Sequence, residues 1–114
     1  MNPLQGIVKF NQERNLVKFN GIAEYNMLME ELQEFLLAVS DNNEYEKVDA
    51  LCDLIVIAAG AIHKLGYDPE ESLVETVLEI TSRNGSLNET TGKWEKDLNQ
   101  DPKTLYKANY FPVR

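Results

Sequence analysis

Carboxylates recur at helical spacing in two neighbouring stretches of the sequence. Glu31 and Glu34 lie three residues apart, and Glu46, Asp49 and Asp53 follow at steps of three and four. Such steps place side chains on one face of an α-helix, so each group forms a compact patch of oxygen ligands. Hard divalent cations such as Mg²⁺ prefer these ligands, and Mn²⁺ accepts them too. The spacing therefore predicts a metal site built from the two patches.

A solvated helix face is the ordinary explanation for any one such pair of acids, so the surroundings of the second patch matter. The other sides of its helix are apolar, with Val48, Leu51, Cys52, Ile55, Ala58 and Ile62. This pattern predicts a buried helix, with Cys52 as a small buried hydrophobe. Acids on a buried helix are unfavourable unless they are paired or bind a metal, and the nearby Lys47 lies on another face. Metal binding by both patches explains why acids would stand on a buried helix.

These acids must be positioned by helices, and the sequence pattern predicts an all-α fold of about four helices. Asn2 and Pro3 can open a first helix, and Gly66 suits the position after a helix end. The further helices are expected over residues 22–39, 44–65 and 69–82. Residues 84–114 are predicted to form an ordered tail of a single domain, 1–114. Its aromatic side chains are interpreted first as anchors that pin the tail to the helices, and second as surfaces for stacking on a base.

The composition limits the possible partners. The 114 residues include 11 basic and 19 acidic ones, which gives a formal net charge of −8. This charge opposes attraction to nucleic acid or to an anionic membrane surface. The longest apolar run is about half of what a membrane span requires. With one cysteine and nothing that resembles a signal peptide, the expected compartment is the cytoplasm.

The order of several motifs along the chain resembles the MazG-like and phosphoribosyl-ATP pyrophosphohydrolase-like families. The resemblance covers roughly residues 28–112. Its motifs are Glu31-Leu32-Gln33-Glu34, Glu46 to Asp53, Gly60-Ala61, Leu65 to Asp68, Glu79-Ile80, Ser82 to Ser86, Gly92-Lys93 and Lys107 to Tyr110. The resemblance implies an all-α, Mg²⁺-dependent enzyme that cleaves a nucleoside triphosphate between the α and β phosphates.

The resemblance also implies roles for the acids. Glu31, Glu34 and Asp53 would be metal ligands. The family has a glutamate where Ala50 stands, so Glu46 or Asp49 would have to supply that further ligand. Glu30 or Glu31 would act as the base that accepts the proton of the attacking water.

The substrate contacts implied by the resemblance are less complete. Asn84 belongs to the Asn-x-Ser motif, but Leu87 stands where the family often has a lysine that meets phosphate. The replacements expected for that lysine are Arg83, Lys93 and Lys96. In an oligomer, the tail, or the first helix with Phe10 and Asn11, is expected to contact the base across the subunit interface.

Two other functions and an assembly state are compatible with the sequence. Phosphoribosyl-ATP is an alternative substrate for the same type of hydrolysis. A non-catalytic helical interaction module is an alternative of another class, favoured by Ala50 and Leu87 at positions where functional residues are usual. A small bundle cannot cover a helix that is apolar all round, so a homodimer or a dimer of dimers is expected.

Overall fold

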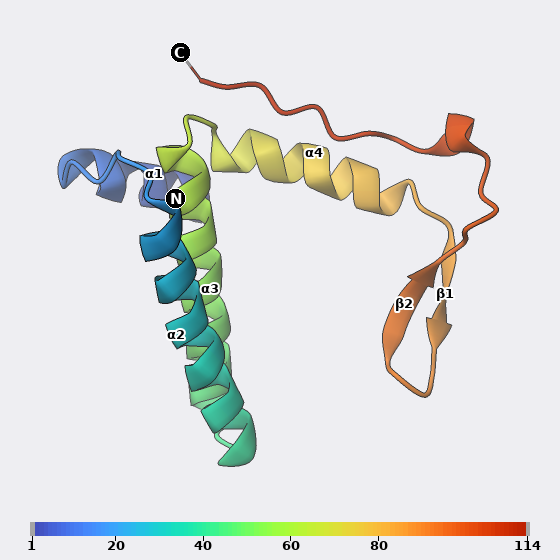
Figure 1. Cartoon of the computed structure of the whole chain (residues 1–114), viewed down its shortest axis with the longest axis horizontal. Helices are drawn as coiled ribbons and strands as arrows, with labels where there is room; N and C mark the ends of the chain where they lie inside the picture. The colour runs from blue at the N-terminus through green and yellow to red at the C-terminus, as the bar shows by residue number, and fades with distance from the viewer. Residues whose placement is uncertain (1, 114) are drawn as a thin grey trace. The chain divides into compact units, whose positions relative to one another are not determined.

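The computed structural model describes residues 2–113 of the chain. The described residues form two compact units, which we treat separately. The first comprises residues 2–69 with 112–113, and the second comprises residues 70–111. Figure 1 shows the elements of both units in chain order, from α1 to the C-terminal segment.

Three helices make up the first unit, and each begins at an asparagine. They are α1 (Pro3–Glu13), α2 (Gly21–Ser40) and α3 (Glu44–Lys64). The side-chain oxygens of Asn2, Asn20 and Asn43 accept hydrogen bonds from backbone amides of the first turns, at Leu4, Ala23 and Glu46. These bonds satisfy amides that lack a partner inside the helix. The predicted helices are confirmed, with ends that differ from the expected ones by a residue or so.

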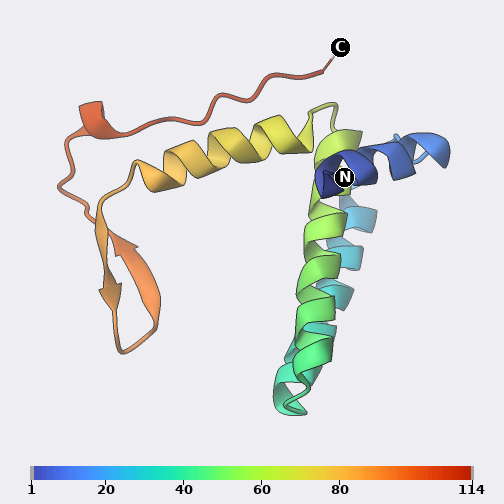
Figure 2. The same ribbon diagram turned by 180° about the vertical axis from the view of Figure 1, so that it is seen from behind.

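Helices α2 and α3 run antiparallel and lie side by side, and α1 contacts α3 (Figures 1 and 2). Two contacts show how α2 and α3 are aligned. Glu24 forms an ion pair with Lys64 near the end of α3, whereas Glu31, further along α2, lies close to Asp53, which comes earlier on α3. Small side chains allow the helices to approach closely. The most buried apolar residues of α2 and α3 are alanines: Ala38, Ala50 and Ala59 are 2–4% exposed.

The prediction that α3 is buried on all sides is wrong for the single chain. Val48 is 60% and Ile55 is 58% exposed, and Cys52 is exposed as well. On α2, Leu36 is 65% exposed. A hairpin of two helices can bury one face of each helix, and α1 covers only part of what remains. Among residues 2–113, no helix is long and apolar enough to cross a membrane.

The second unit contains most of α4 (Pro69–Thr81) and a β-hairpin that the sequence analysis did not predict. Strands β1 (Gly85–Asn88) and β2 (Lys93–Lys96) pair antiparallel, with Leu87 opposite Trp94. Gly92 has a φ of +73° at the end of the connecting turn, a conformation that favours glycine. A short 3-10 helix, Pro102–Thr104, follows. The fold remains mainly α-helical, as predicted, with this small sheet added.

Hydrogen bonds hold the tail along α4. The Tyr106 hydroxyl donates to Glu75, and the Tyr110 hydroxyl bonds Thr76 at 2.8 Å. The backbone amide of Ala108 donates to Glu79 at 2.8 Å, and this bond is the main reason that the pKa of Glu79 lies below its ordinary value. The interpretation of the tail aromatics as anchors is therefore confirmed for Tyr106 and Tyr110.

Candidate functional site

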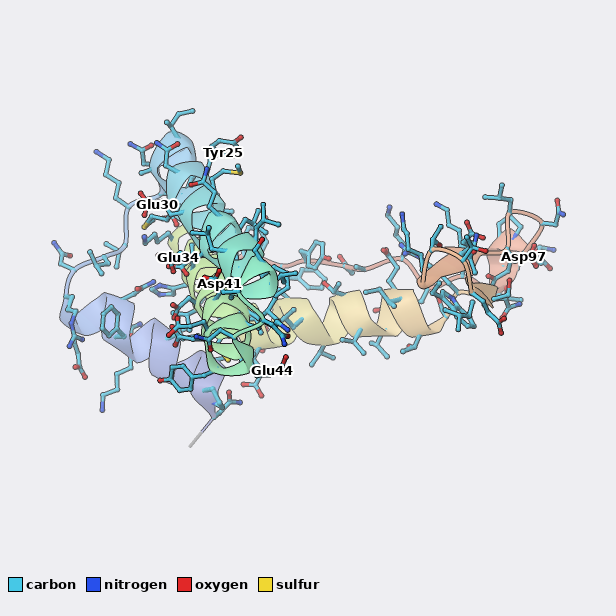
Figure 3. All side chains as sticks on the ribbon, turned by 90° about the horizontal axis from the view of Figure 1, so that it is seen from below. Tyr25, Glu30, Glu34, Asp41, Glu44 and Asp97 are labelled. Atoms are coloured by element: carbon cyan, nitrogen blue, oxygen red, sulfur yellow. The ribbon has the colours of Figure 1, made fainter. Side chains whose placement is uncertain are left out.

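Three of the predicted ligands meet where α2 and α3 face each other. One carboxylate oxygen from each of Glu31, Glu34 and Asp53 lies within 4.8 Å of the other two. Glu31 and Glu34 are one turn apart on α2, and Asp53 comes from α3. Glu34 is exposed, whereas Glu31 and Asp53 are half-buried. Figure 3 shows Glu34 on α2, with Glu30 a turn earlier. The two helices thus supply one acid cluster, as the spacing predicted.

The Glu31 carboxyl has an unusual environment. Its Oε2 atom is buried, and no atom of residues 2–113 is hydrogen-bonded to it. Burial, together with the neighbouring carboxylate of Glu34 and the charges of Asp53 and Asp49, raises the pKa of Glu31 from 4.5 to about 7. Burial disfavours the charged form, and like charges add to this effect. Without a cation, Glu31 is therefore not fully ionised at neutral pH, and the cluster does not carry its full negative charge.

A divalent cation fits this donor set. All three donors are carboxylate oxygens, which are hard ligands suited to Mg²⁺ or Mn²⁺. A cation would neutralise the mutual repulsion of the three acids and would supply a partner for the buried Glu31 Oε2. Both helices are continuous around the cluster, so secondary structure fixes the backbone positions from which the three carboxylates extend. The residues present therefore agree with a metal site.

The other predicted acids lie outside this close group. Glu46, Asp49 and Glu30 are exposed, and none of them belongs to the group of oxygens within 4.8 Å. Asp49 is still near enough for its charge to raise the pKa of Glu31. Ala50, at the position of the family glutamate, is 2% exposed in the packed seam. Direct ligation by Glu46 or Asp49, and base catalysis by Glu30, stay predictions.

The expected phosphate contacts belong to the second unit. Arg83 follows α4 and forms an ion pair with Glu79 at 2.9 Å. Lys93 and Lys96 are the first and last residues of β2. Asn84 precedes β1, and its backbone amide donates to the Gln100 side chain at 2.6 Å. Contact of these four residues with a substrate stays a prediction.

Asn11 lies in the first unit, where α1 packs on α3. It is 4% exposed, and its amide nitrogen donates to the Gly60 carbonyl at 3.3 Å. It also lines a pocket of about 550 Å³ beneath α1. The packing of α1 on α3 explains why a polar residue of a surface helix is buried there.

An ion pair at the far side of the same pocket was missed by the sequence analysis. Lys64 Nζ lies 2.6 Å from Glu24 Oε1, and their side chains are 15% and 7% exposed. Glu24 precedes Glu31 by seven residues, and Lys64 follows Asp53 by eleven. Both intervals return to the same helix face. Extending the acid faces by two or three turns would have revealed the pair.

Comparison with known proteins decides the family. A sequence model of the family described as phosphoribosyl-ATP pyrophosphohydrolase matches residues 13–78, which is more than half of the chain. The chain belongs to this family. The predicted family resemblance is thereby confirmed. No curated protein and no solved structure matches the chain.

The family match covers α2, α3 and most of α4, and so includes all three acids of the cluster. Phosphoribosyl-ATP pyrophosphohydrolases hydrolyse acid anhydrides, which confirms the predicted enzyme class and disfavours a non-catalytic module. Enzymes of this family generally depend on a divalent metal ion, in agreement with the acid cluster. Asn11, the hairpin and the tail lie outside the matched residues.

The raised pKa of Glu31 predicts a pH dependence of stability in the metal-free protein. Between pH 4.5 and about 7 the folded state holds a proton that the unfolded state has released, so the free energy of unfolding falls as pH rises through this window. Glu31→Gln cannot titrate. We therefore expect its melting temperature, measured in EDTA, to rise relative to wild type as the pH increases from about 5 to about 8.

Added Mg²⁺ should stabilise wild type more strongly above about pH 7 than below, because the cation competes with the Glu31 proton. A difference between variant and wild type that does not change with pH would contradict the assignment of this pKa.

Proposed function

We propose that the protein is a Mg²⁺-dependent nucleoside triphosphate pyrophosphohydrolase that releases a nucleoside monophosphate and pyrophosphate. The observation that carries the proposal is the cluster of Glu31, Glu34 and Asp53, with its buried and unpartnered Glu31 oxygen. The family match supports the reaction class.

The side chains of the cluster have distinct roles in this proposal. Glu31, Glu34 and Asp53 would hold the metal, which when bound neutralises phosphate charge and lowers the pKa of a water ligand. Glu30 or Glu31 accepts a proton from the attacking water. The water oxygen bonds to the α phosphorus, the bond to the bridging oxygen breaks, and pyrophosphate leaves.

We propose that the pocket beneath α1 receives the nucleoside. Its α2 side includes Met27, one turn before Glu31, and its α3 side includes Ile57, one turn after Asp53. The pocket thus continues the same helix seam directly beyond the acid cluster. A substrate whose phosphates meet the acids would reach this pocket with its base, where Asn11 would contact it.

Pyrophosphate release across a panel of ribo- and deoxyribonucleoside triphosphates, with and without Mg²⁺, tests the proposal. We expect turnover that requires Mg²⁺ and that Glu34→Gln abolishes. Asp41→Asn, which removes an exposed acid at the end of the same helix, is the matched control and should retain activity. The proposal fails if no nucleotide in the panel is hydrolysed.

Phosphoribosyl-ATP is the second candidate substrate, because the matched family carries its name. The same assay with phosphoribosyl-ATP separates the candidates. A kcat/KM for this compound far above that of every triphosphate in the panel would favour it.

A homodimer or a dimer of dimers is the assembly that we propose. Leu36 and Leu37 on α2 and Val48 and Ile55 on α3 are 58–65% exposed. Extended apolar faces of this kind mark interfaces in soluble proteins. Light scattering at micromolar concentration should give at least twice the chain mass of 13.0 kDa. Val48→Asp combined with Ile55→Asp should shift the protein toward monomer, and a monomeric wild type would contradict the proposal.

A further inference from the structure

Trp94, the single tryptophan of the chain, presents a large aromatic surface on the hairpin. It lies on strand β2 and is 63% exposed. A β-carbon at Gly85 would lie 2.5 Å from Trp94 Nε1, so the absence of a side chain there leaves room for the ring. Within residues 2–113 the cation–π contact lies elsewhere, between Arg14 and Phe10, so no cation covers the indole. The indole is therefore supported by the hairpin and remains open to a ligand.

Basic side chains surround this indole. A first hollow of about 680 Å³ lies beside Trp94, and three basic residues also line it, namely Arg83, Lys93 and Lys96. Lys93 and Lys96 form no ion pair with any other residue of the part that the structure describes, 2–113. The one acid that lines the hollow, Glu95, accepts a hydrogen bond from a neighbouring side-chain amide at 3.2 Å. In a chain with a formal net charge of −8, positive charge thus gathers around the exposed tryptophan.

A second hollow adjoins the first at the end of α4. It has a volume of about 360 Å³, shares Arg83 and Lys96 with the first hollow, and is also lined by Lys107. Its two acids already accept hydrogen bonds, Glu79 from the tail backbone at 2.8 Å and Asp97 from a neighbouring backbone amide at 2.9 Å. The basic side chains therefore continue from the indole into the second hollow.

We infer that the second unit binds a nucleotide by itself, with the base stacked on Trp94 and the phosphates held by Arg83, Lys96 and Lys107. An exposed indole provides a stacking surface for any base, and basic side chains form charge-assisted hydrogen bonds with phosphate. The two volumes suit a ligand of nucleotide size. A longer polyanion is disfavoured by the negative charge of the whole chain.

This inference goes beyond the proposed function. The sequence predicted Arg83, Lys93 and Lys96 as replacements for a single lysine that meets the substrate phosphates. The structure places them around an aromatic ring, in a unit that does not contain the acid cluster. Binding there needs neither the three carboxylates nor a metal ion, so it can be measured without either.

Trp94 reports on its own occupancy, because the chain has one tryptophan. The test titrates the tryptophan fluorescence of the wild-type protein with ATP in EDTA. We expect saturable quenching, because the base stacks on the indole. Tripolyphosphate lacks a base, so it should leave the fluorescence unchanged and should displace ATP only at a concentration at least about 10-fold higher. Adenosine lacks the phosphates and should bind more weakly than ATP.

Variants test the two kinds of contact separately, by calorimetry in EDTA. Trp94→Leu should weaken ATP binding about 10-fold and leave tripolyphosphate binding unchanged. Lys96→Gln removes the cation shared by the two hollows and should weaken the binding of both ligands. Lys103→Gln is the matched control, because Lys103 is an exposed lysine of the same unit that lines neither hollow. The fluorescence series uses wild type, so a folding defect in a variant does not affect it.

Several results would overturn the inference. These are unchanged fluorescence with ATP in EDTA, and tripolyphosphate binding as tight as that of ATP. Quenching that requires Mg²⁺ and is lost in Glu34→Gln would assign the signal to the acid cluster instead. A single-stranded oligonucleotide that binds more tightly than ATP would identify nucleic acid as the partner.

Pyrophosphate release with Mg²⁺, measured in parallel, reports on the proposed function alone. Asp53→Asn should lose this release and keep ATP binding in EDTA, because Asp53 belongs to the first unit. Release by wild type without ATP binding in EDTA would sink the inference and leave the proposed reaction intact. ATP binding without turnover of any nucleotide would do the reverse.

Discussion

Asp53→Asn is expected to lower kcat/KM for triphosphate hydrolysis by at least about 10²-fold, the scale of losing one preorganised charge-stabilising group. The substitution keeps the shape of the side chain and removes one of the three carboxylates whose oxygens lie within 4.8 Å. It also removes the only α3 member of that group, so the cation would be held from α2 alone. Steady-state pyrophosphate release at saturating Mg²⁺ measures the effect.

The metal-free stability of the same variant should move in the opposite direction. Asp53 contributes to raising the pKa of Glu31, so its charge is unfavourable when no cation is present. Asp53→Asn should therefore melt at or above the wild-type temperature in EDTA and gain little from Mg²⁺. Asp41→Asn is again the control. A variant that loses activity only because it unfolds would contradict this account of Asp53.

Lys64→Met is expected to reduce the free energy of unfolding by about 3–5 kcal/mol. Its Nζ is the partner of Glu24 at 2.6 Å, and the Glu24 side chain is only 7% exposed. Removing the lysine leaves a buried carboxylate without its counter-charge, and this carboxylate must then either ionise unpaired or take up a proton. Urea unfolding near neutral pH measures the loss.

The double variant Glu24→Leu with Lys64→Met tests whether the loss in Lys64→Met comes from the unpaired Glu24 carboxylate. Replacing both buried charges with apolar groups of similar size is often neutral or stabilising, so most of the lost free energy should return. Lys9→Met is the matched control, because Lys9 pairs with Glu13 at 3.7 Å on an exposed surface and its loss should cost less than about 1 kcal/mol. A double variant no more stable than Lys64→Met would show that the lysine acts in some other way.

Local sequence signals predicted the helices of this fold well. Asn2 and Pro3 at the start of α1 and Gly66, with its φ of +93° after α3, are short-range features, and they mark helix ends directly. The hairpin was not predicted because its strands have four residues each and contain no β-branched side chain. Gly92 after a polar turn was the available signal. The exposure of Val48 and Ile55 could not be predicted either, since it depends on which surfaces one chain can cover.

The candidate site was predictable in part, because part of it also depends on short-range spacing. Helical spacing brings Glu31 and Glu34 together without any knowledge of the fold, and one expected contact between helices adds Asp53. The choice among Glu46, Asp49 and Asp53 depends on the rotation of α3 about its own axis, which spacing alone does not fix. The Glu24–Lys64 pair continues the same helix faces and was accessible to the same spacing argument. The buried amide of Asn11 depends on how α1 packs on α3, a contact between residues 49 positions apart that leaves little trace in a single sequence.

The central claim is that the carboxylates of α2 and α3 hold a divalent cation. Anomalous scattering from crystals grown with Mn²⁺ tests it most directly. The account predicts a peak bonded to oxygens of Glu31, Glu34 and Asp53 in wild type and no such peak in Asp53→Asn. Mn²⁺ bound elsewhere, or crystals in which these three carboxylates contact only water at saturating Mn²⁺, would contradict it.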